Sequence, residues 1–249
     1  MIFRQLFEDI SSTYTYLIGS EQTGRAILVD PVLPTWQRDL EVTRDLGLTL
    51  AYTLETHIHA DHITSARMMK QEVGSGIAGP SLDGLPCTDV PVDEANPFEM
   101  DDVRLEALHT PGHTDNHMAY KLGDRVLTGD ALLIDGCGRT DFQNGHAPTL
   151  YRSVHDKLFT LPDDQLVHPG HDYHGRWVST IGQEKGRNAR LGQGKSEAEF
   201  LEIMSNLNLA HPKFIDHAVP GNQACGECPS DIPEHLQKYC GEMEQSPQG

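Results

Sequence analysis

The 249-residue sequence lacks any stretch of 18 apolar residues, so nothing in it predicts a membrane-spanning helix. Residues 1–10 include Arg4, Glu8 and Asp9 and contain no apolar run of signal-peptide length. Basic residues are scarce: 19 lysines and arginines stand against 37 acidic residues, and the net charge is −18. A polyanion would be repelled, which argues against nucleic acid as a substrate. We expect a soluble, cytoplasmic protein with neither a membrane nor a nucleic-acid partner.

Cysteine is also sparse, and the five residues are Cys87, Cys137, Cys225, Cys228 and Cys240. An odd number spread over a chain of this length is not typical of a disulfide scaffold, so reduced thiols are expected. Cys225 and Cys228 form one C-x-x-C pair without a second pair at zinc spacing, which favours two ordinary thiols in a C-terminal loop over a structural zinc site. For Cys137 we expect a buried, inert thiol, with a redox role as the alternative.

The length allows one large domain or two small ones, and we expect a single domain over residues 1–249 whose C-terminal portion, from about residue 176, is helical. β-Branched and aromatic runs predict strands over residues 13–19, 25–30, 48–55, 103–109, 118–122, 125–128 and 165–168, the first two as a hairpin. Amphipathic or helix-favouring segments predict helices over residues 34–46, 62–73, 147–160 and 196–207.

Three histidines and a carboxylate occur within seven residues, in the run Thr56-His57-Ile58-His59-Ala60-Asp61-His62. His113, Asp130 and His171 follow downstream, each just after a strand-like segment. Imidazole and carboxylate groups suit borderline transition metals, and loops that leave strands can aim them at one point. The sequence therefore predicts a metal site at the carboxyl edge of a sheet.

Four segments resemble, in order and spacing, the successive metal motifs of the metallo-β-lactamase superfamily. They are Thr56-His57-x-His59-x-Asp61-His62, Pro111-Gly112-His113-Thr114, Thr128-Gly129-Asp130 and Gly170-His171-Asp172. The resemblance implies an α+β fold, a four-layer αββα sandwich with the metal at one edge of two packed sheets.

Residues 130–142, 171–175 and 178–180 further resemble the persulfide dioxygenases, which oxidise glutathione persulfide. This resemblance implies one Fe(II) per chain, held by His57, His113 and Asp130, and a reaction of the persulfide with O2 that yields sulfite and glutathione. A facial set of two histidines and one carboxylate leaves one face of an octahedral iron open for sulfur and O2.

The remaining motif residues have two interpretations. His59, Asp61, His62 and His171 either orient the iron ligands or hold a second metal. With two metals the chain would be a glyoxalase II-like hydroxyacylglutathione thioester hydrolase with a binuclear zinc or mixed-metal centre. A third hypothesis is a noncatalytic metal-binding partner in sulfur transfer.

Substrate binding is expected to involve Arg139, Tyr173 and Arg190, since arginine suits the carboxylates of a glutathione group. The alternative for Arg139 is an ion pair with Asp135 or Asp141 that braces its own loop. We expect a homodimer, and a sulfurtransferase that delivers the persulfide is a further candidate partner.

Overall fold

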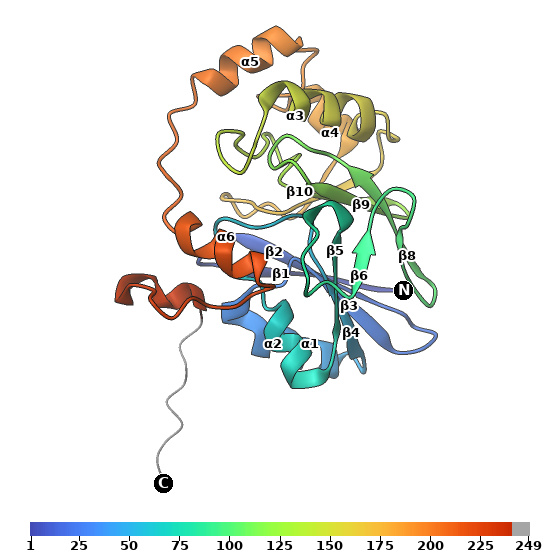
Figure 1. Ribbon diagram of the computed structural model, residues 1–249. Helices are drawn as coiled ribbons and strands as arrows, with labels where there is room; N and C mark the ends of the chain where they lie inside the picture. Colours follow the sequence, from blue (N-terminus) through green and yellow to red (C-terminus); the bar gives the residue numbers. More distant parts are fainter. Residues whose placement is uncertain (241–249) are drawn as a thin grey trace.

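The computed structural model describes residues 1–240, and the part of the single-domain prediction that concerns residues 241–249 lies outside them. The described residues form two six-stranded sheets that pack face to face (Figure 1). The first sheet has the order β1 (Ile2–Glu8), β2 (Thr13–Gly19), β3 (Arg25–Val29), β4 (Thr49–Leu54), β5 (Gly76–Pro80) and β6 (Val90–Val92). Its first three strands are antiparallel, and β3 to β6 are parallel.

The second sheet is mostly antiparallel. Its order is β12 (Ser179–Thr180), β11 (Leu166–Pro169), β10 (Arg125–Gly129), β9 (Met118–Leu122), β8 (Val103–His109) and β7 (Phe98–Met100). Only the pair of β10 and β11 within this sheet is parallel.

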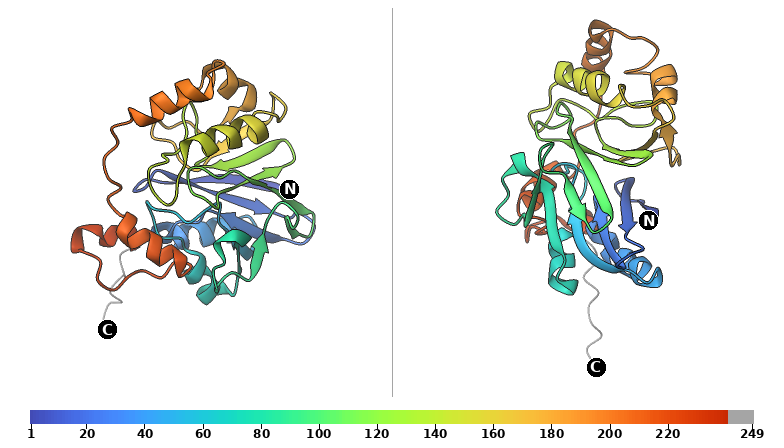
Figure 2. Two further views of the ribbon diagram at one scale, coloured as in Figure 1. Left: turned by 45° about the horizontal axis from the view of Figure 1, so that its top comes forward. Right: turned by 90° about the vertical axis from the view of Figure 1, so that its right-hand side faces the viewer.

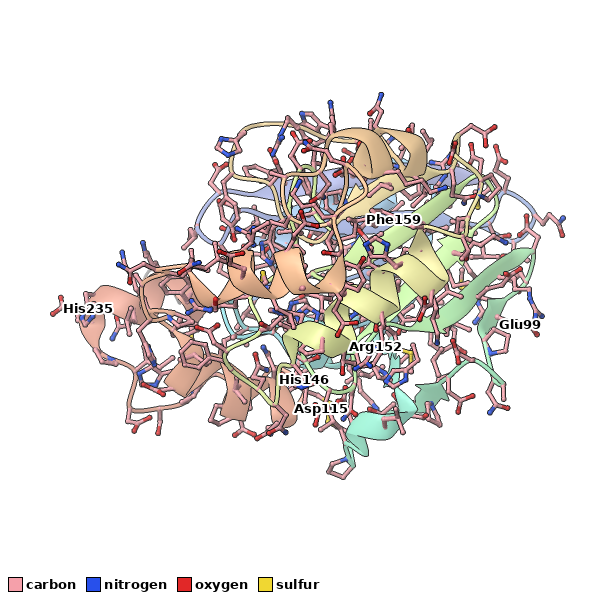
Figure 3. All side chains as sticks on the ribbon, turned by 90° about the horizontal axis from the view of Figure 1, so that it is seen from above. Glu99, Asp115, His146, Arg152, Phe159 and His235 are labelled. Atoms are coloured by element: carbon pink, nitrogen blue, oxygen red, sulfur yellow. A yellow bond between two sulfur atoms is a disulfide. The ribbon has the colours of Figure 1, made fainter. Side chains whose placement is uncertain are left out.

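Helices cover the outer face of each sheet, as the two further views show (Figure 2). The first sheet carries α1 (Trp36–Asp45) and α2 (Ala66–Val73). The second carries α3 (Ala147–Ser153), the π-helical turn Val154–Leu158, α4 (Ile181–Arg187) and α5 (Glu197–Ser205). From above, the segment between His146 and Phe159 crosses the outer face of the second sheet (Figure 3). The predicted four-layer αββα sandwich is therefore confirmed.

Side-chain alternation along the strands divides the core between layers. In β2, Tyr16 and Ile18 enter the core between the sheets, whereas Leu17 points to the helices on the other side. A strand that is buried on both faces shows an unbroken apolar run. In β8, Val103, Leu105 and Ala107 point inward and the two residues between them are exposed, as its alternating sequence predicts.

A further helical segment packs beside α1 and α2. It comprises α6 (Ile215–Gln223) and the 3-10 turn Glu234–Cys240, and short 3-10 turns also cover Leu33–Thr35 and Ser81–Asp83. Phe214 and Ala218 bury their side chains against Leu33 and Ile63. Among the described residues no helix has the length and apolar character needed to cross a membrane.

The predicted elements are present with shifted ends. Elements outside the predicted ranges are the strands β1, β5, β6, β7 and β12 and the helices α4 and α6. The helix expected from residue 62 begins only at Ala66, because residues 62–64 belong to the loop that follows β4. β1, for which the sequence analysis assigned no strand, pairs with β2 along its whole length.

The prediction of reduced thiols was wrong for four of the five cysteines. The fold pairs Cys87 with Cys225 and Cys228 with Cys240 as disulfides, with Cα atoms 6.2 and 5.8 Å apart. The first pair is 138 residues apart in the sequence, so only tertiary packing brings it together. Cys137 is a buried free thiol, and burial raises its pKa to about 11 despite the nearby Arg190, as expected for an inert group.

Candidate metal centre

The candidate ligands gather where four strands end at one edge of the two sheets. His57 follows β4, His113 follows β8, Asp130 follows β10 and His171 follows β11. β4 belongs to the first sheet and the other three strands to the second, so the site lies across the junction of the sheets. Rigid strand ends thus place side chains that are more than 100 residues apart beside one another.

His57, His113 and Asp130 form one candidate group of metal ligands. Each offers one ligand atom, and these atoms all lie within 4.8 Å of one another. The Nε2 atom of His113 is 3.5 Å from Oδ2 of Asp130, and Oδ1 of Asp130 is buried without a hydrogen-bond partner. A buried carboxylate oxygen without a partner is costly, and a cation held between these atoms removes that cost. The three side chains therefore fit a metal ion.

Hydrogen bonds determine which nitrogen of His57 faces the group. The hydroxyl of Thr56 donates to Oδ2 of Asp30 (2.9 Å), so its oxygen accepts from Nδ1 of His57 (2.8 Å). Asp30 also accepts the backbone N–H of Thr56. This relay keeps the proton on Nδ1 and leaves the Nε2 lone pair of His57 for a metal. Burial and the neighbouring histidines hold the pKa of His57 well below its usual value, which favours the neutral ring.

His113 is oriented in the same way by the backbone. Its Nδ1 lies 2.7 Å from the carbonyl oxygen of Arg139, which can only accept a hydrogen bond. The proton is therefore on Nδ1, and Nε2 faces Asp130.

Asp130 is held by a histidine that the sequence analysis did not select. The backbone N–H of Asp130 donates to Nε2 of His117 (3.0 Å), whose other nitrogen bonds the hydroxyl of Thr110. His117 is fully buried, and burial together with His113 keeps its pKa well below the ordinary value, so it can accept. The available signal was its position four residues after His113, immediately before the strand β9.

Glycines pack around Asp130 and leave no room for larger residues. A Cβ atom at Gly170 would lie 2.7 Å from Oδ1 of Asp130, and one at Gly129, where φ is +47°, would lie 2.5 Å from Nε2 of His117. Gly170 thus allows the backbone to approach the carboxylate closely, and Gly129 leaves room for the ring of His117.

His59 directs one ring nitrogen away from the group of His57, His113 and Asp130. Its Nε2 lies 3.2 Å from Asp30 and 3.3 Å from Glu55, while Nδ1 is buried without a partner. Burial opposes the charged ring, but the two carboxylates outweigh it and raise the pKa of His59 well above its usual value. His59 therefore links the loop that follows β4 (residues 55–63, called the metal loop below) to the buried carboxylate of Asp30.

Asp61, His62 and His171 lie close to one another beside this group. His62 Nδ1 lies 3.1 Å from Asp61, and His171 Nε2 lies 3.6 Å from both Asp61 and Asp130. Burial lowers the pKa of His171, yet Asp130 and Asp61 raise it above the usual value overall. His59, Asp61 and His62 also bring ligand atoms within 4.8 Å of one another, so six of the seven motif residues lie in two groups of three. His171 approaches one carboxylate of each group.

A cavity of about 750 Å³ opens beside the group of His57, His113 and Asp130 and is large enough for a tripeptide-sized ligand. His113 and Asp130 line it, and so do the predicted substrate residues Arg139, Tyr173 and Arg190.

These three residues differ in how much of their bonding capacity is free. Arg139 forms a two-pronged ion pair with Asp141, at 2.6 and 2.7 Å, and donates to the carbonyl of Ala210. Arg190 donates to the carbonyl of Cys137. Tyr173 is 67% exposed and stacks parallel to His171. The bracing contact expected as the alternative for Arg139 is thus present, at the rim of the cavity.

The sequence model of the metallo-β-lactamase superfamily matches residues 9–171. Persulfide dioxygenase ETHE1, mitochondrial, from Homo sapiens is 45% identical over 234 residues, which cover 91% of this chain and 89% of the human protein. The crystal structure of ETHE1 from Myxococcus xanthus is 53% identical and superposes with a TM-score of 0.88, over 91% of this chain and all of that one. Hydroxyacylglutathione hydrolase cytoplasmic from Arabidopsis thaliana is 35% identical over 173 residues, 66% of this chain and 65% of that protein.

The fold, the order of the motifs and the position of the site at the sheet edge are those of the metallo-β-lactamase superfamily, and the chain belongs to it. Within that superfamily the chain belongs to the family of the persulfide dioxygenases.

Proposed function

We propose that this protein is a non-haem iron(II) dioxygenase that oxidises glutathione persulfide with O2 to sulfite and glutathione. The observation that carries the proposal is the group of His57, His113 and Asp130, of which His113 and Asp130 line the 750 Å³ cavity. The identity to persulfide dioxygenases over 91% of the chain supports it.

In this proposal His57, His113 and Asp130 hold one iron per chain. Bound Fe(II) supplies redox chemistry and open coordination positions for a persulfide sulfur and O2. The protein keeps both imidazoles in the tautomer that presents Nε2, through Thr56 and the carbonyl of Arg139.

Substrate recognition is assigned to the rim of the cavity. Arg139 and Arg190 are the cationic residues that meet the glutathione carboxylates, and the exposed ring of Tyr173 packs against the peptide. On a chain with a net charge of −18, and in a cavity that four aspartates also line, these arginines are the groups that can pair with ligand carboxylates.

His59, Asp61, His62 and His171 are proposed to orient the iron ligands and bound water. In support, His59 uses one nitrogen on Asp30 and Glu55, and His171 approaches Asp130. The alternative is a thioester hydrolase with two metal ions. In that enzyme the second group, His59, Asp61 and His62, would hold the second metal ion. A noncatalytic sulfur-transfer partner ranks last, because none of the seven motif residues is missing.

The test begins with metal analysis of protein purified without chelator, followed by anaerobic loading with Fe(II). We expect about one iron per chain, and uptake of one O2 per glutathione persulfide in an oxygen electrode with formation of one sulfite. An Asp130→Asn variant is the matched control and should lose iron and uptake together. Two zinc ions per chain with turnover of a hydroxyacylglutathione thioester, and no oxygen uptake, would establish the hydrolase instead.

We further propose that the described residues 1–240 form one domain with a helical C-terminal portion from about residue 176, and that the protein acts as a homodimer in the cytoplasm. The helices α4, α5 and α6 in this portion support the first part. Light scattering after gel filtration tests the dimer. A sulfurtransferase that hands over the persulfide is a candidate partner, tested by faster oxygen uptake in its presence.

A further inference from the structure

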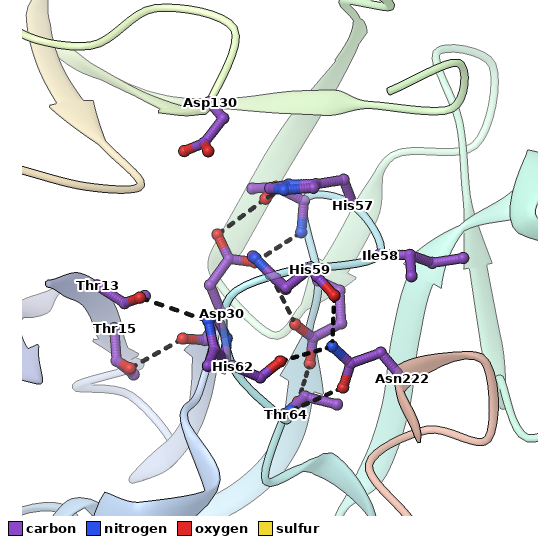
Figure 4. A network of polar contacts seen from close by, with 12 residues as sticks. Thr13, Thr15, Asp30, His57, Ile58, His59, His62, Thr64, Asp130 and Asn222 are labelled. Atoms are coloured by element: carbon purple, nitrogen blue, oxygen red, sulfur yellow. Dashed lines mark hydrogen bonds and ion pairs between the residues drawn. The ribbon is translucent and has the colours of Figure 1, made fainter. Parts of the chain in front are cut away.

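One buried side chain from the C-terminal segment makes three hydrogen bonds to the loop that carries the metal motif. Asn222, at the end of α6, is 4% exposed. Its Nδ2 donates to the carbonyl oxygens of His59 (2.9 Å) and His62 (2.8 Å), and its Oδ1 accepts the N–H of Thr64 (2.9 Å). Figure 4 shows Asn222 reaching this loop from α6, on the side away from Asp130.

The loop needs such a partner because it has no regular structure. Residues 55–63 contain neither helix nor strand, so their backbone polar groups lack the partners that a ladder or a helix would provide. A primary amide has two donors and one carbonyl oxygen, and Asn222 uses them on three backbone groups that span residues 59–64. These contacts define the loop conformation between the candidate ligands.

Asn222 is itself held in place by several independent contacts. Three residues later, Cys225 is bonded to Cys87, and its carbonyl oxygen accepts the N–H of Arg67 at the start of α2. The backbone of Gly226, at φ +96°, passes so close to the loop that a Cβ atom there would lie 2.2 Å from the carbonyl oxygen of Thr64. The end of α6 therefore cannot slide relative to the metal loop.

We propose that Asn222 is a positioning residue of the metal centre: its amide fixes the loop so that His57, Asp61 and His62 present their ligand atoms. It lies outside residues 9–171, which match the superfamily model, so these hydrogen bonds come from the C-terminal part of this chain. Asn222 acts through the backbone of the loop and does not line the substrate cavity.

The test measures metal binding in anaerobic apo-protein with Co(II) as the probe, by its d–d absorption and its dissociation constant. In Asn222→Ala all three bonds are lost, and in Asn222→Asp the two donors are lost while the shape is kept. We expect both variants to bind Co(II) at least about tenfold more weakly, with an altered absorption spectrum, since removal of groups that orient ligands has effects of this size. The neighbouring, exposed Gln223→Ala is the control and should match the wild type.

Unchanged affinity and spectrum in the Asn222 variants would overturn the proposal, whatever happens to their unfolding temperature. If Asn222→Ala and Asn222→Asp do not fold, Asn222→Ser, which keeps a hydroxyl donor, is judged by the same two measurements. The inference rests on the proposed metal site but needs neither persulfide nor O2. Absence of Co(II) binding by the wild type would contradict the site itself, whereas wild-type binding with unaffected variants contradicts only the role of Asn222.

Discussion

The packing of Gly138 against two candidate ligands leads to a sharp prediction. A Cβ atom on this residue would lie 2.6 Å from the carbonyl oxygen of Asp130 and 2.7 Å from Nδ1 of His113. Ordinary contacts begin at about 3.4 Å, so in Gly138→Ala the two ligands or the loop must move by roughly 0.8 Å. The N–H of Gly138 also donates to that carbonyl oxygen of Asp130 (2.7 Å), so the movement would strain this bond as well.

A misplacement of about 1 Å in a catalytic constellation lowers the rate by about 100-fold. We therefore expect Gly138→Ala to reduce kcat/KM for oxygen uptake by about that factor and to weaken Co(II) binding to the apo-protein. Gly136→Ala is the matched control, because a Cβ atom there meets nothing within 4 Å and neither glycine has a positive φ. Circular dichroism should show that both variants are folded.

Two results would refute this reasoning. If Gly138→Ala keeps the wild-type metal affinity and rate, then the close approach to His113 and Asp130 has no role in the site. If Gly136→Ala loses as much kcat/KM and Co(II) affinity as Gly138→Ala, then the effect comes from the loop as a whole and not from contact with the two ligands.

Three further predictions concern pH, substrate and the disulfides. His168 is buried against aromatic rings with neither ring nitrogen bonded, and burial lowers its pKa to about 4. The unfolded chain therefore binds the extra proton as the pH falls below about 6.5, which costs roughly 2 kcal/mol of stability between pH 7.5 and pH 5. His168→Leu should reduce the pH dependence of the free energy of urea unfolding by that amount, and an unchanged dependence would contradict the assignment. Arg139→Ala should raise KM for the persulfide with little change in kcat, whereas an unchanged KM with a lower unfolding temperature would leave only the contact with Asp141. Thiol titration of the unfolded, unreduced protein should find one free thiol, and Cys87→Ser should lower stability by up to about 5 kcal/mol, because its disulfide closes a loop of 138 residues. Five free thiols would show that neither disulfide forms.

The sequence by itself was sufficient for the fold class and for the group of candidate ligands. The reason is that the motif residues occur in short runs just after strands, as His57 does after β4 and Asp130 after β10. Strand periodicity is a local property, and the residue types that suit a metal can be recognised without knowing their neighbours in space. Their order along the chain was enough to indicate the superfamily.

Only the tertiary structure decided how that group is supported and what surrounds it. Asn222 and the loop at His59 are 163 residues apart, and Cys87 and Cys225 are 138 apart. Contacts of this kind depend on how α6 packs against the loop after β4, and nothing in the local pattern of either segment encodes the partner. The same holds for His117, whose place behind Asp130 follows from the pairing of β9 with β10. The residue types of the candidate ligands can be read from short segments of the sequence, whereas the hydrogen bonds that orient the ligands form only when distant segments pack together.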